Sequence, residues 1–163
     1  MAEFSEDIIQ RNKIFEELKR AHDEESLKRE KPAANVEIDT GDGKEFKVYS
    51  VKLWEDTPGS LLKHIDKAIA TEIVVAKIDN VLWDLSRPFE KECRVRYIPF
   101  SSTEGRNVFW HSSAHVLGEA CESHFAPNCL LSHGPPVEEG FFYDMRIGEG
   151  YAHSPRSCLG QAL

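Results

Sequence analysis

The chain has 163 residues, of which 40% are hydrophobic, and a formal net charge of -8 at pH 7. This length allows one large hydrophobic core or two small ones, and therefore one or two domains. The acidic balance argues against strong autonomous binding to nucleic acid, because that affinity comes mainly from Lys and Arg releasing counterions from phosphates.

Nothing in the sequence directs the chain to a membrane, and we expect a cytoplasmic protein with no membrane partner. No apolar run reaches the roughly 18 residues of a membrane span, and the start, MAEFSEDIIQ, lacks the basic end and apolar core of a signal peptide. The cysteines have no CxxC spacing, which argues against a zinc ribbon and indicates reduced thiols. They are Cys93, Cys121, Cys129 and Cys158.

Residues 6–31 are predicted to form a charged helix, because they contain neither Pro nor Gly and carry Ile8, Phe15 and Leu18 at helical spacing. Opposite charges four residues apart, such as Glu24 and Lys28, support it. A helix of this kind is solvated or docks a partner, and an RNA-binding arm is the less favoured alternative. The segment KPAAN, residues 31–35, is expected to be a linker.

From Val36 the apolar period changes to two, and the turn TGDGK predicts a β-hairpin over residues 36–48. A helix over residues 57–70 is predicted next, with Thr57 as its N-cap and Pro58 at its first position. Its apolar face, which should cover the sheet, consists of Leu61, Leu62, Ile65, Ala68 and Ile69.

Two short strands are predicted around Asp79 and Asn80, a pair that tolerates left-handed turns, and a further strand in CRVRYIPF. Two strands, a helix and more strands within about 65 residues are typical of a β-grasp, ubiquitin-like module. Exposed arginines could contact an RNA backbone, although solvated surface is the favoured interpretation. They are Arg87, Arg94 and Arg96.

After the linker SSTEGRN, a second long helix is predicted to begin near Asn107. One side of it carries Phe109, Ser113, Val116, Leu117, Ala120 and His124. The opposite side brings His111, His115, Gly118 and Glu122 within about 60° of one another. Small and polar residues on one side of a helix are typical of a cleft wall.

His111 and His115 leave three interpretations open: a zinc site, hydrogen-bonding surface residues, or a substrate cleft in which neutral imidazoles handle protons. The metalloprotease pattern fails, because Ser112 stands where HExxH places its Glu. A Gly/Pro loop then leads to an aromatic strand at residues 141–145, and residues 146–163 are expected to be a frayed, disordered tail.

At this point several segments together resemble one family. They are DGKEF, TPGSLLKHI, VVAKIDNVLWDLSRPFE, FWHSSAHVLGEA and HGPPVEEGFFYDM. The chain resembles the N-terminal part of the threonyl-tRNA synthetases (threonine–tRNA ligases), in their eukaryotic cytosolic form, over roughly residues 8 to 145.

The resemblance implies an α+β protein in four parts. Residues 1–34 would be a charged helical extension and residues 35–101 a TGS domain with the β-grasp fold. Residues 102–145 would be the first, incomplete part of an α+β tRNA-editing domain, and residues 146–163 a divergent tail.

In the family, the editing site hydrolyses serine mischarged onto threonine tRNA. His111 and His115 match its HxxxH pair, which is opposed by a Cys-x-x-x-His pair from a later segment. We do not expect this later pair here, because Cys121 and His124 have the wrong spacing and no His follows Cys158.

The resemblance further implies tRNA as a partner, synthetase-complex proteins docking through the N-terminal helix, and a homodimer for the full-length ligase. ATP and zinc are expected only with the full-length protein, and no cofactor or metal is expected in this chain. The class II catalytic core is not recognisable here. The favoured hypothesis is therefore the N-terminal fragment of a threonine–tRNA ligase, inactive alone, ending in a gene-model or truncation artefact. The alternative is a real short form that binds RNA or a partner without catalysis.

Overall fold

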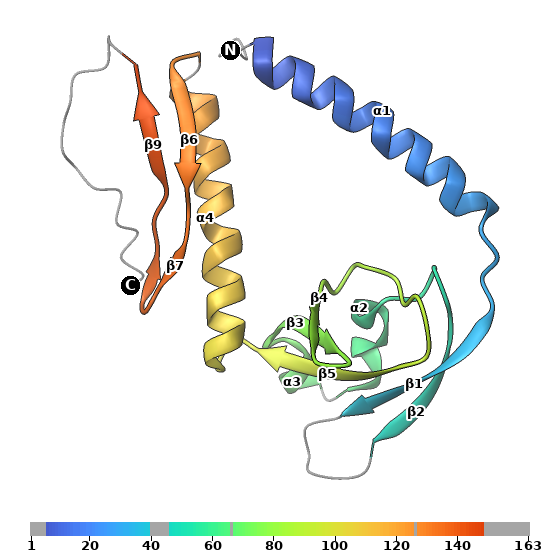
Figure 1. The fold of residues 1–163 in the computed structure, drawn as a ribbon. Coiled ribbons are helices and arrows are strands. Elements are labelled where there is room, and N and C mark those ends of the chain that lie inside the picture. The colour runs from blue at the N-terminus through green and yellow to red at the C-terminus, as the bar shows by residue number, and fades with distance from the viewer. Residues whose placement is uncertain (1–5, 40–45, 66, 126, 149–163) are drawn as a thin grey trace. The chain divides into compact units, whose positions relative to one another are not determined.

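The structure, a computed structural model, describes residues 6–39, 46–65, 67–125 and 127–148. It contains two compact units (Figure 1). One comprises His22–Arg106, and the other combines the described parts of Met1–Ala21 and Asn107–Leu163. No helix among the described residues combines the length and apolar character of a membrane span. The tail expected over residues 149–163 lies outside the described residues.

The predicted N-terminal helix is confirmed as α1, Glu6–Lys28. Acidic Glu6 and Asp7 in the first turn and basic Lys28 in the last complement the helix dipole. No residue of α1 is buried, so local propensity and charge pairs account for the helix. The linker expected over residues 31–35 is shorter than predicted, because the first strand already begins at Ala33.

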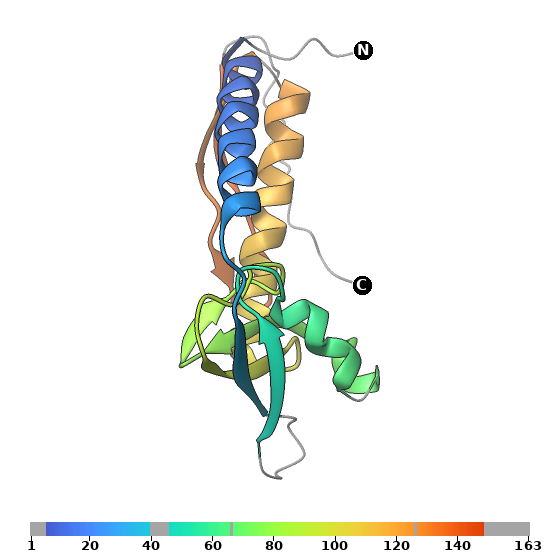
Figure 2. The same cartoon turned by 90° about the vertical axis from the view of Figure 1, so that its right-hand side faces the viewer.

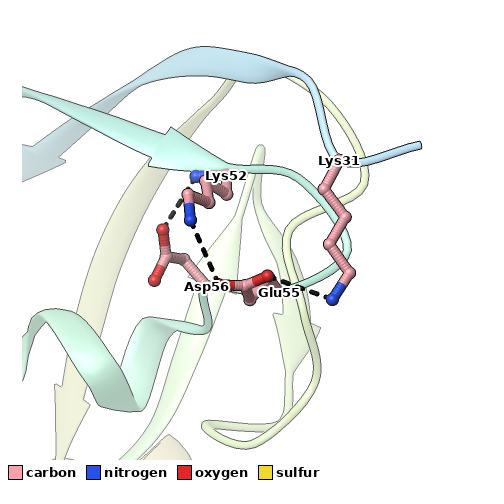
Figure 3. Close-up of polar contacts among 4 residues, drawn as sticks. All are labelled: Lys31, Lys52, Glu55 and Asp56. Carbon is pink, nitrogen blue, oxygen red and sulfur yellow. Dashed lines mark hydrogen bonds and ion pairs between the residues drawn. The ribbon is translucent and has the colours of Figure 1, made fainter. Parts of the chain in front are cut away.

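The predicted hairpin is also confirmed. Strand β1, Ala33–Asp39, pairs antiparallel with β2, Lys47–Lys52, and the two run side by side in both views (Figure 1, Figure 2). The chain then turns through a set of polar contacts (Figure 3). Asp56 accepts a hydrogen bond from the backbone N–H of Lys52 at 2.7 Å, and Glu55 pairs with Lys31 at 3.0 Å and with Lys52 at 3.5 Å.

The helix predicted over residues 57–70 is wrong as a continuous element. Thr57 does cap α2, Pro58–Leu61, but the 3-10 turn η1, Leu62–His64, follows at once. At Ile65 the backbone is extended, with φ -105° and ψ 158°, and a separate turn α3, Lys67–Ala70, comes later. The break lets Leu62 and Ile65 pack against the core, whereas Ala68 and Ile69 are exposed.

Three further strands complete a mixed sheet of the order β2-β1-β5-β3-β4 in the described residues. They are β3, Ile73–Ile78, β4, Val81–Trp83, and β5, Cys93–Pro99. The central pair β1–β5 is parallel, and the other pairs are antiparallel, as in a β-grasp domain. Asp79 and Asn80 have φ angles of 49° and 70°, which confirms the predicted left-handed turn.

The core of this unit lies on one face of the sheet, beneath α2 and the segment that precedes β5. Alternation along β1 and β5 buries Val36, Ile38 and Val95 completely. Tyr97 is also buried; burial raises the pKa of its phenol, and its hydroxyl donates to the carbonyl of Pro58 at 2.7 Å. Phe89, from the irregular segment before β5, is fully buried and is the largest such side chain.

The other unit packs small strands against the second long helix. Helix α4, Thr103–Phe125, begins four residues before the predicted start and runs beside β6, Cys129–His133, in Figure 1. Strand β9, Asp144–Ile147, pairs antiparallel with β6. The aromatic strand predicted over residues 141–145 is interrupted. Its first residues form a short hairpin of β7, Pro136–Val137, with β8, Gly140–Phe141.

The side of α4 that carries Phe109 and Val116 is exposed. Val116 is 69% exposed and Phe109 42% exposed, and Ala120 and His124 are exposed as well. The buried residues are instead small: Gly105, Ala114 and Gly118. Small residues allow a neighbouring segment to approach the helix closely, and this close approach decides which side is covered.

Candidate functional site

Helix α4 carries both candidate histidines on one side. The helix begins where the hydroxyl of Ser102 accepts the backbone N–H of Gly105 at 3.0 Å, which satisfies a donor that the first turn leaves free. His111 and His115 lie one turn apart, so their side chains are neighbours on the helix surface. Both are exposed, as a site that admits a substrate from solution requires.

The two imidazole rings contact each other directly. Their Nε2 atoms lie 3.1 Å apart, and the rings meet edge to face, with centroids 4.6 Å apart and planes at 87°. At this distance one Nε2 donates a hydrogen bond and the other accepts it. Which ring is the donor depends on which of the two carries its proton on Nε2. A proton added or removed at one ring therefore changes the hydrogen bonding of the other.

Tyr143 is a third member of the site, and the sequence reasoning missed it. Its ring meets the His115 ring edge to face, with centroids 6.0 Å apart. Two residues earlier, Phe141 stacks on Trp110 of α4, with centroids 5.7 Å apart. In an extended segment, residues two apart lie on the same side, so FFYD indicates that Phe141 and Tyr143 share a side. Nothing in the sequence indicates that this side faces α4.

The other potential ligands do not gather around the pair. In the part of the chain that the structure describes, no three His, Cys, Asp or Glu residues are arranged to hold a metal ion. Burial raises the pKa of the Cys129 thiol, and the nearby Cys121 and Glu122 raise it further. The thiol therefore stays protonated at neutral pH.

Cys129 and His133 do have the Cys-x-x-x-His spacing of the family's second pair, which the sequence reasoning overlooked. Both residues lie on strand β6, where four residues span about 13 Å. In addition, Cys129 is buried and His133 exposed. These two side chains therefore do not form a second pair that resembles His111 and His115.

The arginines considered for RNA contact all have carboxylate partners. Arg94 pairs with Glu37 at 2.9 Å, Arg96 with Asp39 at 3.3 Å and Arg87 with Glu90 at 2.7 Å. The first two line a recess of about 760 Å³ on the sheet, together with residues such as Phe46 and Lys77. Acidic and basic side chains alternate across the recess, which does not present the uniformly positive surface typical of RNA contact.

No family model matches the chain. The threonine–tRNA ligase, cytoplasmic, of Caenorhabditis elegans is 38% identical over 89% of this chain and 19% of its own length. The enzyme of the same name from Saccharomyces cerevisiae is 35% identical over 95% of the chain and 21% of its own length. The threonine–tRNA ligase 1, cytoplasmic, of Homo sapiens is 39% identical over 88% of the chain and 19% of its own length. The chain thus spans about a fifth of the length of the curated relatives it matches.

Proposed function

Because the chain is homologous to the N-terminal part of the cytoplasmic threonine–tRNA ligases, we propose that it serves as the N-terminal part of such a ligase. In this role it acts in the cytoplasm, and its partner is the tRNA to which threonine is attached. Similarity along about nine tenths of the chain supports this proposal. ATP, zinc and a second copy of the ligase belong to the proposed full-length protein.

Within this role residues 35–101 are proposed to be a TGS domain, since the strand order of their sheet is that of a β-grasp. Residues 102–145 are proposed to contribute half of an editing site for seryl-tRNA. The observation that carries the editing proposal is the contact between the exposed residues His111 and His115, whose Nε2 atoms lie 3.1 Å apart.

The chemistry proposed for the pair is ester hydrolysis by general base catalysis. In the contact of the two neutral rings, the ring whose Nε2 donates keeps the lone pair of its Nδ1 free. This Nδ1 takes a proton from water, and the water oxygen attacks the carbonyl carbon that joins serine to the tRNA. The bond from this carbon to the ribose oxygen then breaks, the ribose oxygen takes a proton, and free serine leaves. His111 and His115 hold and pass the protons, while the opposing half of the site must come from outside residues 6–148. These 163 residues alone are proposed to be inactive, because Cys129 and His133 have the only Cys-x-x-x-His spacing in the sequence and do not form such a pair.

A chimera tests the proposal. Residues 1–148 would replace the matching region of the S. cerevisiae enzyme, and both threonine attachment and the release of serine from seryl-tRNA would be measured. We expect the chimera to attach threonine, which supports the ligase role. We also expect His111→Ala and His115→Ala each to slow serine release at least about 100-fold. The control is His124→Ala, an exposed histidine of the same helix, which should leave both rates unchanged.

Two results would contradict the proposal separately. If the chimera is folded but cannot attach threonine, the chain does not serve as the N-terminal part of a ligase. If it attaches threonine and the histidine variants release serine at the rate of the parent, the pair has no role in editing.

A second candidate function, docking of a partner without catalysis, is favoured by α1. Its apolar residues are unusually exposed, with Ile9 at 56%, Phe15 at 60% and Leu18 at 66%. Apolar side chains on an otherwise charged helix are typical of helix-to-helix docking. In this proposal α1 binds proteins of a synthetase complex. The double substitution Phe15→Glu and Leu18→Glu should shift the chain from large to small assemblies in sedimentation of cytoplasmic extract, and an unchanged profile would contradict it.

A further inference from the structure

Two glycines from separate segments lie against the same edge of the Tyr143 ring. A Cβ atom added to Gly118 of α4 would lie 2.7 Å from Cε2 and 2.9 Å from Cδ2 of that ring. A Cβ atom at Gly134, just after β6, would lie 2.5 Å from Cδ2 and 2.7 Å from Cε2. Real Cβ atoms do not approach a ring so closely, so each glycine leaves space that the ring fills.

The backbone conformation does not explain these glycines. Gly140, with a φ of 143°, is the only described glycine with a positive φ. Neither Gly118 nor Gly134 therefore needs the left-handed region. Gly118 lies inside a helix, where alanine would be the better helix former. Both glycines are buried. The space that they leave for Tyr143 is therefore a physical reason for a glycine at each position. At Gly134 a Cβ atom would also lie 3.1 Å from Cβ of Ala114.

The same ring also meets the His115 ring, with centroids 6.0 Å apart. The Tyr143 and His115 planes meet at 69°, and the His115 and His111 planes at 87°. The three rings thus form a chain of edge-to-face contacts with His115 in the middle. A displacement of the tyrosine ring reaches His115 before it reaches His111.

We propose that Gly118 and Gly134 form a slot that holds the Tyr143 ring and thereby sets the orientation of His115. Gly118 and Gly134 are positioning residues, because neither has a side chain that could touch a substrate. Any effect of the slot on serine release rests on the proposed editing function. The orientation itself does not, and it is measured separately.

Nuclear magnetic resonance of the full chain tests the slot. The ring-proton shifts of His111, His115 and His124 would be compared between the parent and Gly118→Ala or Gly134→Ala. We expect the His115 shifts to change several-fold more than those of His111, and those of His124 to stay unchanged. The control Glu119→Ala alters an exposed neighbour on the same helix and should move none of them. Unchanged His115 shifts in both folded glycine variants would overturn the proposal.

A second set of variants covers the case in which a glycine variant does not fold. Tyr143→Leu removes the ring and keeps apolar volume, so the ring-current contribution to the His115 shifts should disappear. Combining Gly118→Ala with Tyr143→Ala frees the occupied space, because the three atoms nearest to a Cβ at Gly118 all belong to the Tyr143 ring, and should restore cooperative unfolding. Two results would contradict the slot. One is that the His115 ring-proton shifts are the same in Tyr143→Leu as in the parent, and the other is that the double variant remains unfolded.

The chimera separates this inference from the function. There, Gly134→Ala should lower kcat for serine release and leave KM unchanged, because it alters a histidine and no substrate contact. If the histidine variants have no effect on serine release while His115 moves in the glycine variants, the slot stands and the editing function fails. If the histidine variants slow release and His115 does not move, the editing function stands and the slot fails.

Discussion

Arg94 donates to one carboxylate oxygen of Glu37 from both its Nε, at 3.0 Å, and its Nη2, at 2.9 Å. The two residues are direct partners in the parallel β1–β5 pair, and the Arg94 guanidinium also covers the Phe46 ring at 4.4 Å. The arginine is thus engaged on its own sheet, and a phosphate would have to displace a carboxylate to bind it.

This arrangement predicts that carboxylates suppress RNA binding by the sheet. Glu37→Gln removes the acceptor charge from Arg94, and we expect affinity for tRNA to rise by roughly five-fold at 0.1 M salt, the effect of about one added phosphate contact. Fluorescence anisotropy over a salt series measures both the affinity and its slope. The control Glu55→Gln removes a carboxylate at the β2 corner, which lies outside the residues that line the recess. Equal effects of the two variants would show that only net charge matters.

Phe89 is predicted to be a main source of stability in the β-grasp unit. It is fully buried, and its backbone also donates to Asp56 at 2.9 Å and accepts from Trp54 at 2.8 Å. We expect Phe89→Ala to lower the free energy of unfolding by about 3–5 kcal/mol, because it leaves a large cavity. Urea unfolding followed by tryptophan fluorescence measures this. Val81→Ala, at a residue 61% exposed, should change it by less than about 0.5 kcal/mol.

The carboxylate of Asp79 is predicted to make the free energy of unfolding depend on pH. Its carboxylate accepts the backbone N–H of Arg94 at 3.0 Å and pairs with Lys91 at 3.1 Å, and these contacts lower its pKa below the ordinary value. A carboxyl group with a lowered pKa in the folded state contributes stability above its unfolded pKa, near 4, and this is lost as the pH falls through the folded pKa.

The variant Asp79→Asn keeps an acceptor and a residue that tolerates positive φ, and removes only the charge. The side chain is 42% exposed, so the expected loss at pH 7 is small, roughly 0.5 kcal/mol. The difference between parent and variant should shrink below about pH 4 in urea unfolding between pH 2 and 7. A difference that stays constant across this range would contradict the assigned role of the charge.

Cys93 is predicted to react slowly. Burial, with the nearby Asp79 as a smaller cause, raises the pKa of its thiol to about 11. At pH 8 only roughly one thiol in a thousand is then ionised, against about a quarter at the ordinary pKa. Alkylation by iodoacetamide, mapped by mass spectrometry, should be at least about 100-fold slower at Cys93 in the folded protein than in urea. Equal rates in the two conditions would show that the thiol is neither buried nor shifted.

Local signals in the sequence predicted the β-grasp unit well. The alternation of Val95 and Tyr97 with Arg94 and Arg96 gave the buried face of β5, and Asp79 with Asn80 marked the turn before β4. Such signals depend on one or two residues and their own backbone. The continuous helix over residues 57–70 was wrong because the extended backbone at Ile65, which interrupts it, is stabilised by packing on the sheet and leaves no mark in the local pattern.

The site was predicted in part. The spacing of His111 and His115 was sufficient to place them side by side, since a helix repeats every 3.6 residues. Tyr143 was missed because it joins the pair from another segment, and nothing local distinguishes it from its aromatic neighbours. The covered side of α4 carries Ala114 and Gly118, and nothing in the sequence indicated which segment lies against them.

By itself, the sequence determined the two long helices, the strands of the β-grasp unit, the resemblance to the threonine–tRNA ligases and the neighbouring histidines, because each of these depends on residues close together in the chain. Tertiary structure alone decided which side of α4 is covered, the break at Ile65, the carboxylate partners of the arginines and the contact of Tyr143 with His115. Each of these depends on which distant segments approach closely enough to exclude one another's atoms, and that approach is set by packing across the fold and not by any local period.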